Sequence, residues 1–111
     1  MADCLFCRIV KGEIPSKKVL EDASVYAFED VVPKAPVHVL VVPKRHVAGA
    51  ADAADDPALL GATLAGAARV ARERGLADYR LVVNNGAGAG QSVFHLHVHL
   101  LAGRPFAWPP G

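Results

Sequence analysis

The stretch Val93-Phe94-His95-Leu96-His97-Val98-His99-Leu100-Leu101 decides how the rest of the chain is interpreted. Histidines and apolar residues alternate through it, and a period of two predicts a β-strand over 93–101. Residues two apart on a strand project from the same face, so the histidines would form a row of imidazoles. A single histidine is usually an ordinary surface or core residue, but three alternating histidines in an otherwise apolar segment indicate a function. The row therefore predicts a functional site.

Two kinds of chemistry fit histidines on one strand face. One is a catalytic zinc with an open coordination position, and the other is a nucleophile accompanied by phosphate ligands. The preceding stretch, 84–92, is rich in glycine and ends in the donors Gln91 and Ser92, which suits a loop around an anion. It has neither P-loop spacing nor a following helix pattern. A glycine-rich turn is a weak signal by itself, but it favours phosphate chemistry here.

Outside this stretch, the sequence predicts four more extended segments and two helices. Extended segments are predicted at 18–21, 25–28, 37–42 and 79–83. A long helix is expected from Asp56, a good N-cap with Pro57 at the first helical position, to Gly75. Its apolar residues at helical spacing are Leu60, Leu64, Ala67, Ala68 and Ala71. A short helix over 4–11 would end at Gly12. Consecutive strands that pair as antiparallel neighbours, with one helix covering a face, give an α+β fold.

Size and charge narrow the class of protein. The chain has 111 residues, of which 52% are hydrophobic, so it is predicted to form a single domain over 1–111. Lys and Arg number 12 against 11 Asp and Glu, a balance that argues against nucleic acid or an anionic membrane as a partner. The N-terminus lacks a secretory apolar region, and no apolar stretch approaches the roughly 20 residues of a membrane span. We therefore expect a soluble, cytoplasmic protein.

Cys4 and Cys7 form a C-x-x-C pair. Such a pair supplies half of a tetrahedral zinc site, and two further ligands must come from elsewhere in the chain. A redox pair is less favoured because the β-α-β context of thioredoxin-like chains is absent. The plain alternative is two reduced thiols that pack as small hydrophobic groups.

The segment 95–101 resembles the H-φ-H-φ-H-φ-φ signature of the histidine triad (HIT) family, in which φ is apolar. Other segments are similar to its Hint branch, the nucleoside phosphoramidases. These segments are Phe28-Glu29-Asp30, Ala35-Pro36-Val37-His38, Val42-Pro43-Lys44-Arg45-His46, Asn84, Gly90-Gln91-Ser92 and Trp108-Pro109-Pro110-Gly111. Together they cover essentially the whole chain in the right order.

The resemblance implies a five-stranded antiparallel sheet with one long helix and a short N-terminal helix. It also implies a homodimer in which two sheets become continuous. The expected activity is hydrolysis that releases a nucleoside 5′-monophosphate, with purine (AMP) expected, from a phosphoramidate or a related leaving group. The reaction would pass through a covalent nucleotidyl intermediate on His97.

Individual roles follow from the same resemblance. His97 would be the nucleophile, and His99 and His38 would contact phosphate oxygens. The phosphate cradle would be completed by Asn84, Gly90, Gln91 and Ser92, with Ser92 near the leaving group. Asp30 would accept hydrogen bonds from ribose hydroxyls, Val31 would form an apolar wall, and the tail with Trp108 would reach the partner's active site. The plain alternatives are a turn-forming Asp30 and an ordinary loop role for Ser92.

The resemblance also implies a structural zinc on Cys4, Cys7, His46 and His95, with no cofactor required for catalysis. Two other functions remain open. One is a dinucleoside polyphosphate hydrolase of the Fhit type, which shares the triad but is disfavoured by the Hint-like C-terminus. The other is a nucleotide-binding or zinc-stapled interaction module.

Overall fold

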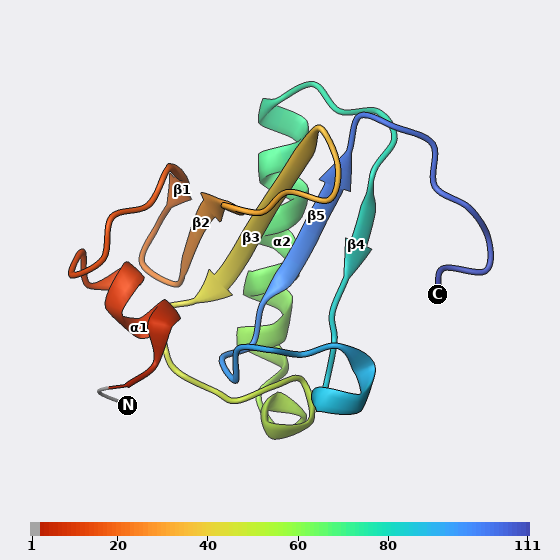
Figure 1. Cartoon of the computed structure of the whole chain (residues 1–111). Coiled ribbons are helices and arrows are strands. Elements are labelled where there is room, and N and C mark those ends of the chain that lie inside the picture. Colours follow the sequence, from red (N-terminus) through yellow and green to blue (C-terminus); the bar gives the residue numbers. More distant parts are fainter. Residues whose placement is uncertain (1–2) are drawn as a thin grey trace.

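The computed structural model describes residues 3–111, so Met1 and Ala2 of the predicted domain lie outside the described residues. Five strands form one antiparallel sheet in the order β1-β2-β3-β5-β4, and the long helix α2 lies behind it in Figure 1. The helices and strands are α1 (Leu5–Val10), β1 (Lys18–Glu21), β2 (Val25–Glu29), β3 (Val37–Pro43), α2 (Pro57–Glu73), β4 (Arg80–Val82) and β5 (Val98–Ala102), with short 3₁₀ turns at Ala51–Ala53 and Ala87–Ala89. This confirms the predicted α+β class, the five-stranded antiparallel sheet, the long helix and the short N-terminal helix.

The long helix begins where the sequence predicts. The Asp56 carboxylate accepts a hydrogen bond from the Leu59 amide at 3.1 Å, and Pro57 occupies the first helical position. Beyond the helix, Gly75 adopts a φ of +68°, which glycine tolerates without strain. Within residues 3–111, no helix is both long enough and apolar enough to cross a membrane.

The buried face of α2 includes Ala67 and Ala71 of the predicted apolar residues but not the others. Leu64 and Ala68 are exposed, and the face against the sheet is formed by Thr63, Gly66, Ala67, Val70 and Ala71. Small residues form most of this face because the helix lies close to the strands. A Cβ atom on Gly66 would stand 3.1 Å from Val25 Cγ2 and 3.2 Å from Val41 Cγ1. The apolar spacing identified the helix, but the closeness of packing selected its buried side.

The predicted strand over 93–101 is wrong in its first half. Strand β5 begins only at Val98, which pairs with Val41 of β3. Continuing this register would bring residue 96 opposite Pro43, which has no N–H to donate to the ladder. Residues 93–97 instead follow the loop after β3, and the Leu96 amide donates to the Val47 carbonyl at 2.8 Å. Similarly, the segment predicted at 79–83 shortens to Arg80–Val82.

The sheet separates two cores by simple alternation. On the α2 side lie Val25, Ala27, Val39, Val41, Val98 and Leu100. On the opposite side lie Tyr26, Phe28, Leu40 and Val42, together with Phe6 and Ile9 of α1. His38 and His99 share this second face, because they alternate with residues of the first core. The imidazoles therefore lie on the side that α2 leaves uncovered.

Candidate active site and metal centre

The five histidines and Phe6 form a continuous row of rings, although only His99 of the triad lies on a strand. The ring centroids of His46 and His95 are 4.8 Å apart, those of His97 and His99 are also 4.8 Å apart, and those of His99 and His38 are 5.2 Å apart. Between His95 and His97 lies the ring of Phe6, with centroids 6.0 and 5.1 Å from theirs. The structure thus brings the predicted catalytic and metal-binding histidines together in one row.

His97 is buried and held by one main-chain contact. Its Nδ1 lies 2.8 Å from the carbonyl oxygen of His95. A carbonyl oxygen only accepts, so Nδ1 carries the proton and Nε2 keeps a free lone pair in the neutral ring. His97 also lines the open cavity described below. A neutral imidazole nitrogen with a free lone pair at a cavity wall is equipped to act as a nucleophile.

His38 and His99 form a relay of hydrogen bonds beside it. The Lys34 amide donates to His38 Nδ1 at 3.0 Å, so the proton of a neutral His38 is on Nε2. That Nε2 lies 2.9 Å from His99 Nδ1 and 3.4 Å from Asp30 Oδ2. With His99 Nδ1 as the acceptor, its own proton is on Nε2. The relay therefore leaves His99 with a hydrogen-bond donor to offer to an anion.

Burial keeps both relay histidines neutral. It lowers the pKa of His99 to about 4, and positive charge on His97 or His38 acts in the same direction. Burial also lowers the pKa of His38, and the nearby Asp30 carboxylate only partly opposes this effect. Since Nε2 of His38 carries a proton, the group Asp30–His38–His99 is built for hydrogen bonding and not for lone-pair ligation of a metal. Neutral rings near pH 7 preserve the donor pattern described above.

A mainly apolar cavity of about 330 Å³ opens in front of His97 and His99. Its walls come from α1, the following loop, β2, β3 and the loop before β5, and include Phe6, Ile9, Phe28, Leu40 and Val93. Asp30, Val31 and Ser92 lie on the same lining, and Val31 is 92% exposed. This volume lies within the range of small-molecule sites, in which apolar walls surround a few polar groups.

The other residues predicted for substrate binding take different positions. The Gln91 amide is buried and engaged by the main chain: its Oε1 accepts from the Gly86 amide at 2.8 Å, and its Nε2 donates to the Ala48 carbonyl at 2.7 Å. This side chain holds the glycine-rich loop in place. Asn84 lies beside Gly90, which adopts a φ of +100°. Trp108 is 83% exposed, and the cavity lining does not include it.

Four predicted metal ligands converge at the other end of the row. Cys4 Sγ is 3.4 Å from His95 Nδ1, Cys7 Sγ is 3.4 Å from His46 Nδ1, and the two imidazole Nδ1 atoms are 3.1 Å apart. Tetrahedral zinc with ordinary bond lengths would separate sulfur from nitrogen by about 3.5 Å and two nitrogens by about 3.3 Å. The spacing of the four donor atoms, all within 4.8 Å of one another, fits this ion.

The orientation of His95 supports the same assignment. Its Nε2 lies 2.8 Å from the Pro43 carbonyl oxygen and must carry the proton, so Nδ1 presents a lone pair to the thiols. Metal-binding histidines commonly donate their second nitrogen to such a carbonyl group. The residues present therefore fit a zinc ion, which would join α1 to the loops after β3 and before β5.

Comparisons with known proteins agree with this arrangement. The HIT domain family matches residues 11–106. The chain belongs to the HIT domain family. A HIT family hydrolase from Legionella pneumophila has the same fold with a TM-score of 0.93, is 48% identical, and aligns with 98% of this chain and 100% of its own.

Two further HIT relatives bear more specific names. A histidine triad nucleotide-binding protein from Candida albicans has a TM-score of 0.83 and 36% identity, with 96% of this chain and 83% of its own covered. The 14 kDa zinc-binding protein of Zea mays is 48% identical over 111 residues, which cover 96% of this chain and 87% of that protein. The HIT assignment therefore accounts for both the fold and the triad motif.

Sequence reasoning missed two contributors to this HIT site. Phe6 contacts both His95 and His97, and the carbonyl oxygen of Pro43 selects which nitrogen of His95 faces the thiols. The position of Phe6 between two cysteines on a short helix was a usable signal, because its ring must project away from them. A main-chain carbonyl leaves no comparable signal in the sequence.

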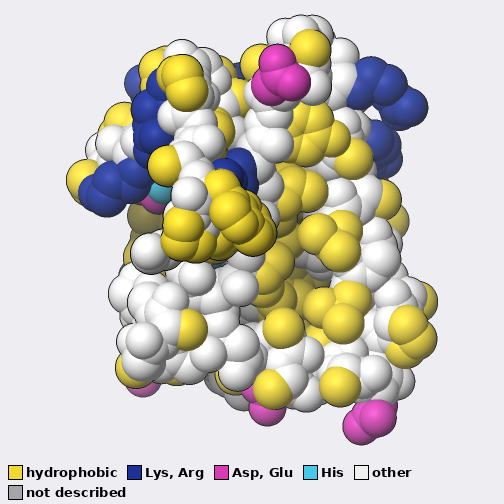
Figure 2. All heavy atoms as spheres, turned by 90° about the vertical axis from the view of Figure 1, so that its right-hand side faces the viewer, with side chains coloured by type: hydrophobic (Ala, Val, Ile, Leu, Met, Phe, Trp, Pro, Cys, Tyr) yellow, Lys and Arg dark blue, Asp and Glu magenta, His cyan; other side chains and the backbone are white. Residues whose placement is uncertain are grey.

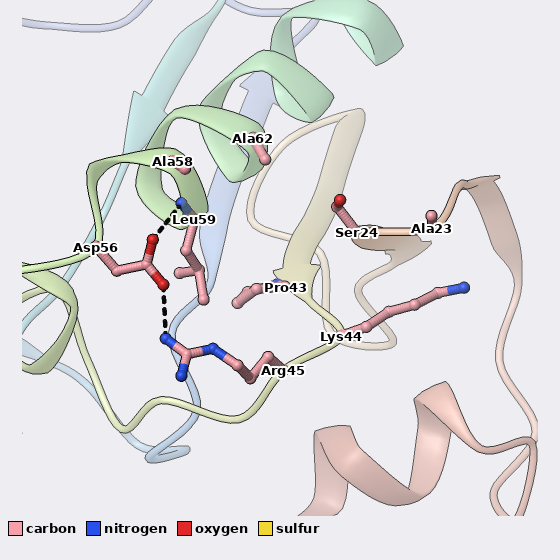
Figure 3. Close-up of a pocket in the computed structure, with 9 residues that line it drawn as sticks. All are labelled: Ala23, Ser24, Pro43, Lys44, Arg45, Asp56, Ala58, Leu59 and Ala62. Atoms are coloured by element: carbon pink, nitrogen blue, oxygen red, sulfur yellow. Dashed lines mark hydrogen bonds and ion pairs between the residues drawn. The ribbon is translucent and has the colours of Figure 1, made fainter.

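A separate hollow lies outside the HIT site, between the end of β3 and the start of α2 (Figure 3). Arg45 and Asp56 on its wall form an ion pair at 2.7 Å. Lys44 pairs with Glu21 at 2.8 Å. Both cations of this hollow are already partnered, whereas the cavity at His97 combines open space with reactive nitrogens. The histidine row is therefore the candidate functional site.

Proposed function

We propose that this protein is a hydrolase that releases a nucleoside 5′-monophosphate, AMP among the purine nucleotides, from a phosphoramidate or a related leaving group. The observation that carries the proposal is the hydrogen bond from His97 Nδ1 to the His95 carbonyl, which leaves Nε2 free at the cavity. The names of the HIT family hydrolase and of the nucleotide-binding relative support the reaction class and the ligand class.

The proposed reaction has two displacements at phosphorus. His97 Nε2 attacks the α-phosphorus, a phosphorus–nitrogen bond to the ring forms, and the bond to the leaving amine breaks as that amine takes up a proton. Water then attacks the same phosphorus, the bond to Nε2 breaks, and the monophosphate leaves with the ring returned to its neutral form. The His99 Nε2–H group stabilises the charge that develops on the phosphate oxygens in both steps.

The remaining cavity residues are proposed to bind the substrate. Phe6, Phe28 and Leu40 provide an apolar surface for a base, and Val31 lies at the rim. The Asp30 carboxylate has an oxygen 3.4 Å from His38 Nε2 and lies on the cavity lining, where it accepts hydrogen bonds from ribose hydroxyls. Asn84 and Ser92 contribute donors to the phosphate, with Ser92 on the leaving-group side. The amide of Gly90 already donates to the Ala87 carbonyl at 3.0 Å, so Gly90 contributes to the cradle by allowing the turn at a φ of +100°.

Zinc has a structural role in this proposal. Cys4, Cys7, His46 and His95 would hold it, and their fit to tetrahedral spacing and the zinc-binding name of the maize relative support this. When bound, the ion cross-links α1 to two loops and takes no part in the displacement. A reducing, cytoplasmic setting is proposed because it would keep both thiols available.

We also propose a homodimer through the edge of β4. This strand ends the sheet order, so its outer hydrogen-bonding groups can pair with a second copy. Apolar side chains gather on the side of the molecule that carries β4 (Figure 2). Tyr79 and Val83, which flank β4, and Leu64 of α2 are exposed. Pairing would also bring the Trp108 tail of one copy toward the other site. Light scattering should give a dimer for the parent chain and a monomer for Leu64→Glu.

The test of the activity is AMP release from adenosine 5′-phosphoramidate by the parent protein and by His97→Ala. The parent should release AMP at saturating substrate, and it should still do so after chelation of zinc. His97→Ala should release none. Arg45→Gln, in the remote hollow, is the control and should match the parent. Binding without release would favour a nucleotide-binding module, and release abolished by chelation and restored by zinc would favour a metalloenzyme. Preferential cleavage of dinucleoside polyphosphates would indicate the Fhit type.

A further inference from the structure

Phe6 occupies a position between the two candidate functional regions. It lies between Cys4 and Cys7 on α1, yet its ring is directed into the core on the cavity side. The ring is 4% exposed and stands edge-on to His97, with centroids 5.1 Å apart and planes at 89°. It also contacts the ring of His95 at 6.0 Å. One residue therefore touches a metal ligand, the nucleophile and the cavity.

The position of Phe6 depends on the thiol cluster. Helix α1 has only six residues, too few to be stable without tertiary contacts. Its two cysteines flank Phe6 and face His95 and His46 at 3.4 Å, so a metal held by these four donors would fix both ends of the segment that carries Phe6. The apolar contacts of Phe6 and Ile9 with the sheet hold the other side of the helix.

A second link between the two regions runs through the main chain. His95 offers Nδ1 to the cluster, while its carbonyl oxygen accepts the hydrogen bond from His97. A substitution cannot remove this carbonyl group. A substitution can remove only the other link, the side chain of Phe6.

We propose that Phe6 is a positioning residue that couples metal binding at Cys4, Cys7, His46 and His95 to nucleotide binding and reaction at His97. The metal-bound cluster holds α1, the helix holds the Phe6 ring against His97, and the same ring completes the cavity wall. By linkage, zinc then favours nucleotide binding and nucleotide favours zinc binding by the same factor. The inference rests on the proposed nucleotide site.

The first experiment measures the dissociation constant of AMP by calorimetry, with zinc-loaded and metal-free protein. The parent should bind AMP about tenfold more tightly when loaded, a factor within the usual range for coupled sites. Phe6→Leu should reduce that factor to less than about threefold. The matched control is Val31→Ala, because Val31 lines the same cavity but is 92% exposed and lies in the loop after β2, whereas Phe28 packs directly on Phe6. This control should keep the full zinc effect while binding AMP more weakly.

A second readout uses the zinc-loaded proteins and does not require a folded metal-free form. Phe6→Leu should lower kcat about tenfold, whereas Val31→Ala should act mainly on KM. Circular dichroism establishes that each variant is folded. An equal zinc effect in the parent and Phe6→Leu, or an equal change in kcat in Phe6→Leu and Val31→Ala, would overturn the proposed role of Phe6.

A third readout separates this proposal from the nucleotide function. If no variant and no form of the protein binds AMP, the proposed function fails. The ring resonances of His97, followed by NMR during zinc titration, then decide the coupling. A smaller zinc-dependent shift in Phe6→Leu than in Val31→Ala supports it, and equal shifts contradict it.

Discussion

His95 and His97 are two residues apart, yet they present opposite nitrogens to opposite regions. His95 uses Nε2 on the Pro43 carbonyl and turns Nδ1 toward two thiols and His46. His97 uses Nδ1 on the His95 carbonyl and keeps Nε2 free beside His99 and the cavity. In the proposed function, the same side chain would therefore be a metal ligand in one place and a nucleophile in the other.

The comparison of His95 with His97 shows that the hydrogen-bond partner of an imidazole, and not the residue type, determines which nitrogen is available for chemistry. A carbonyl oxygen fixes which nitrogen carries the proton, and the surroundings of the other nitrogen then determine its chemistry. Around His95 those surroundings are two cysteine sulfurs, which suit zinc. Around His97 they are a relay of neutral histidines and open space, which suit an attack on phosphorus.

The largest expected effect comes from the nucleophile side. His97→Ala should reduce AMP release by at least about 10³-fold, because the covalent route is lost while the cavity walls remain. The change is measured by initial rates on adenosine 5′-phosphoramidate. Retained binding of AMP by the variant would separate loss of chemistry from loss of the site. A reduction of less than about tenfold would remove His97 from its proposed role.

Removing the proposed metal ligands should lower the stability of the folded protein. Cys4→Ser combined with Cys7→Ser should abolish tight zinc binding and lower the midpoint of thermal unfolding by at least about 10 °C, since a ligand well above its Kd contributes about 4 kcal/mol. Metal analysis and calorimetry check these outcomes. The paired variant should still release AMP at saturating substrate, at a reduced rate. An unchanged midpoint together with retained zinc would place the metal elsewhere.

A ribose contact sharpens the account of the nucleophile side. Asp30→Asn keeps the acceptor that Val32 uses at 2.9 Å but removes the charge near His38, and should raise KM about tenfold, as expected for a hydrogen bond to a charged group. Substrates with and without ribose hydroxyls form the control. The variant and the parent should handle a 2′,3′-dideoxy substrate alike. An equal loss with both substrates would make Asp30 a turn residue only.

Acidification tests the neutral relay. In the folded protein burial holds the pKa of His99 at about 4, below its ordinary value near 6.5, so between these values the unfolded chain binds more protons. This contribution to stability is complete above about pH 6.5 and declines as the pH falls toward about 4. His99→Gln should therefore lose less stability than the parent between about pH 7 and pH 5 in denaturant unfolding. Parallel losses would show that His99 titrates normally.

The smallest effect is expected outside both regions. Arg45→Gln breaks the exposed ion pair with Asp56 and should cost no more than about 1 kcal/mol of unfolding free energy. AMP release should stay at the parent level. Denaturant unfolding and the same rate assay provide the measurements. A large loss of activity would mean that the hollow in Figure 3 belongs to the functional site.

Much of the fold could be predicted because its signals are local. Asp56 and Pro57 mark the start of α2, and β-branched and aromatic residues mark β2 and β3. The strand predicted from residue 93 failed because its pairing with β3 stops at Val41, two residues before Pro43, and this depends on tertiary structure. The exposure of Leu64 was missed for a similar reason, since the closeness of α2 to the sheet depends on Gly66.

The residues that make up the candidate site could be predicted more readily than their arrangement. Spacing and resemblance selected the histidines and cysteines that the structure brings together. They did not reveal that Gln91 holds the loop through Gly86 and Ala48, or which nitrogen of each histidine is free. Those properties depend on carbonyl groups supplied by distant segments, and a main-chain carbonyl is identical in every residue.

The most direct test of the central claim is intact-mass analysis of the protein quenched in alkali during turnover of adenosine 5′-phosphoramidate, followed by peptide mapping. The account predicts a transient adenylyl adduct on His97, present in zinc-loaded and chelated parent protein and absent from His97→Ala. An adduct on another residue, AMP release with no adduct, or an adduct that requires zinc would contradict it.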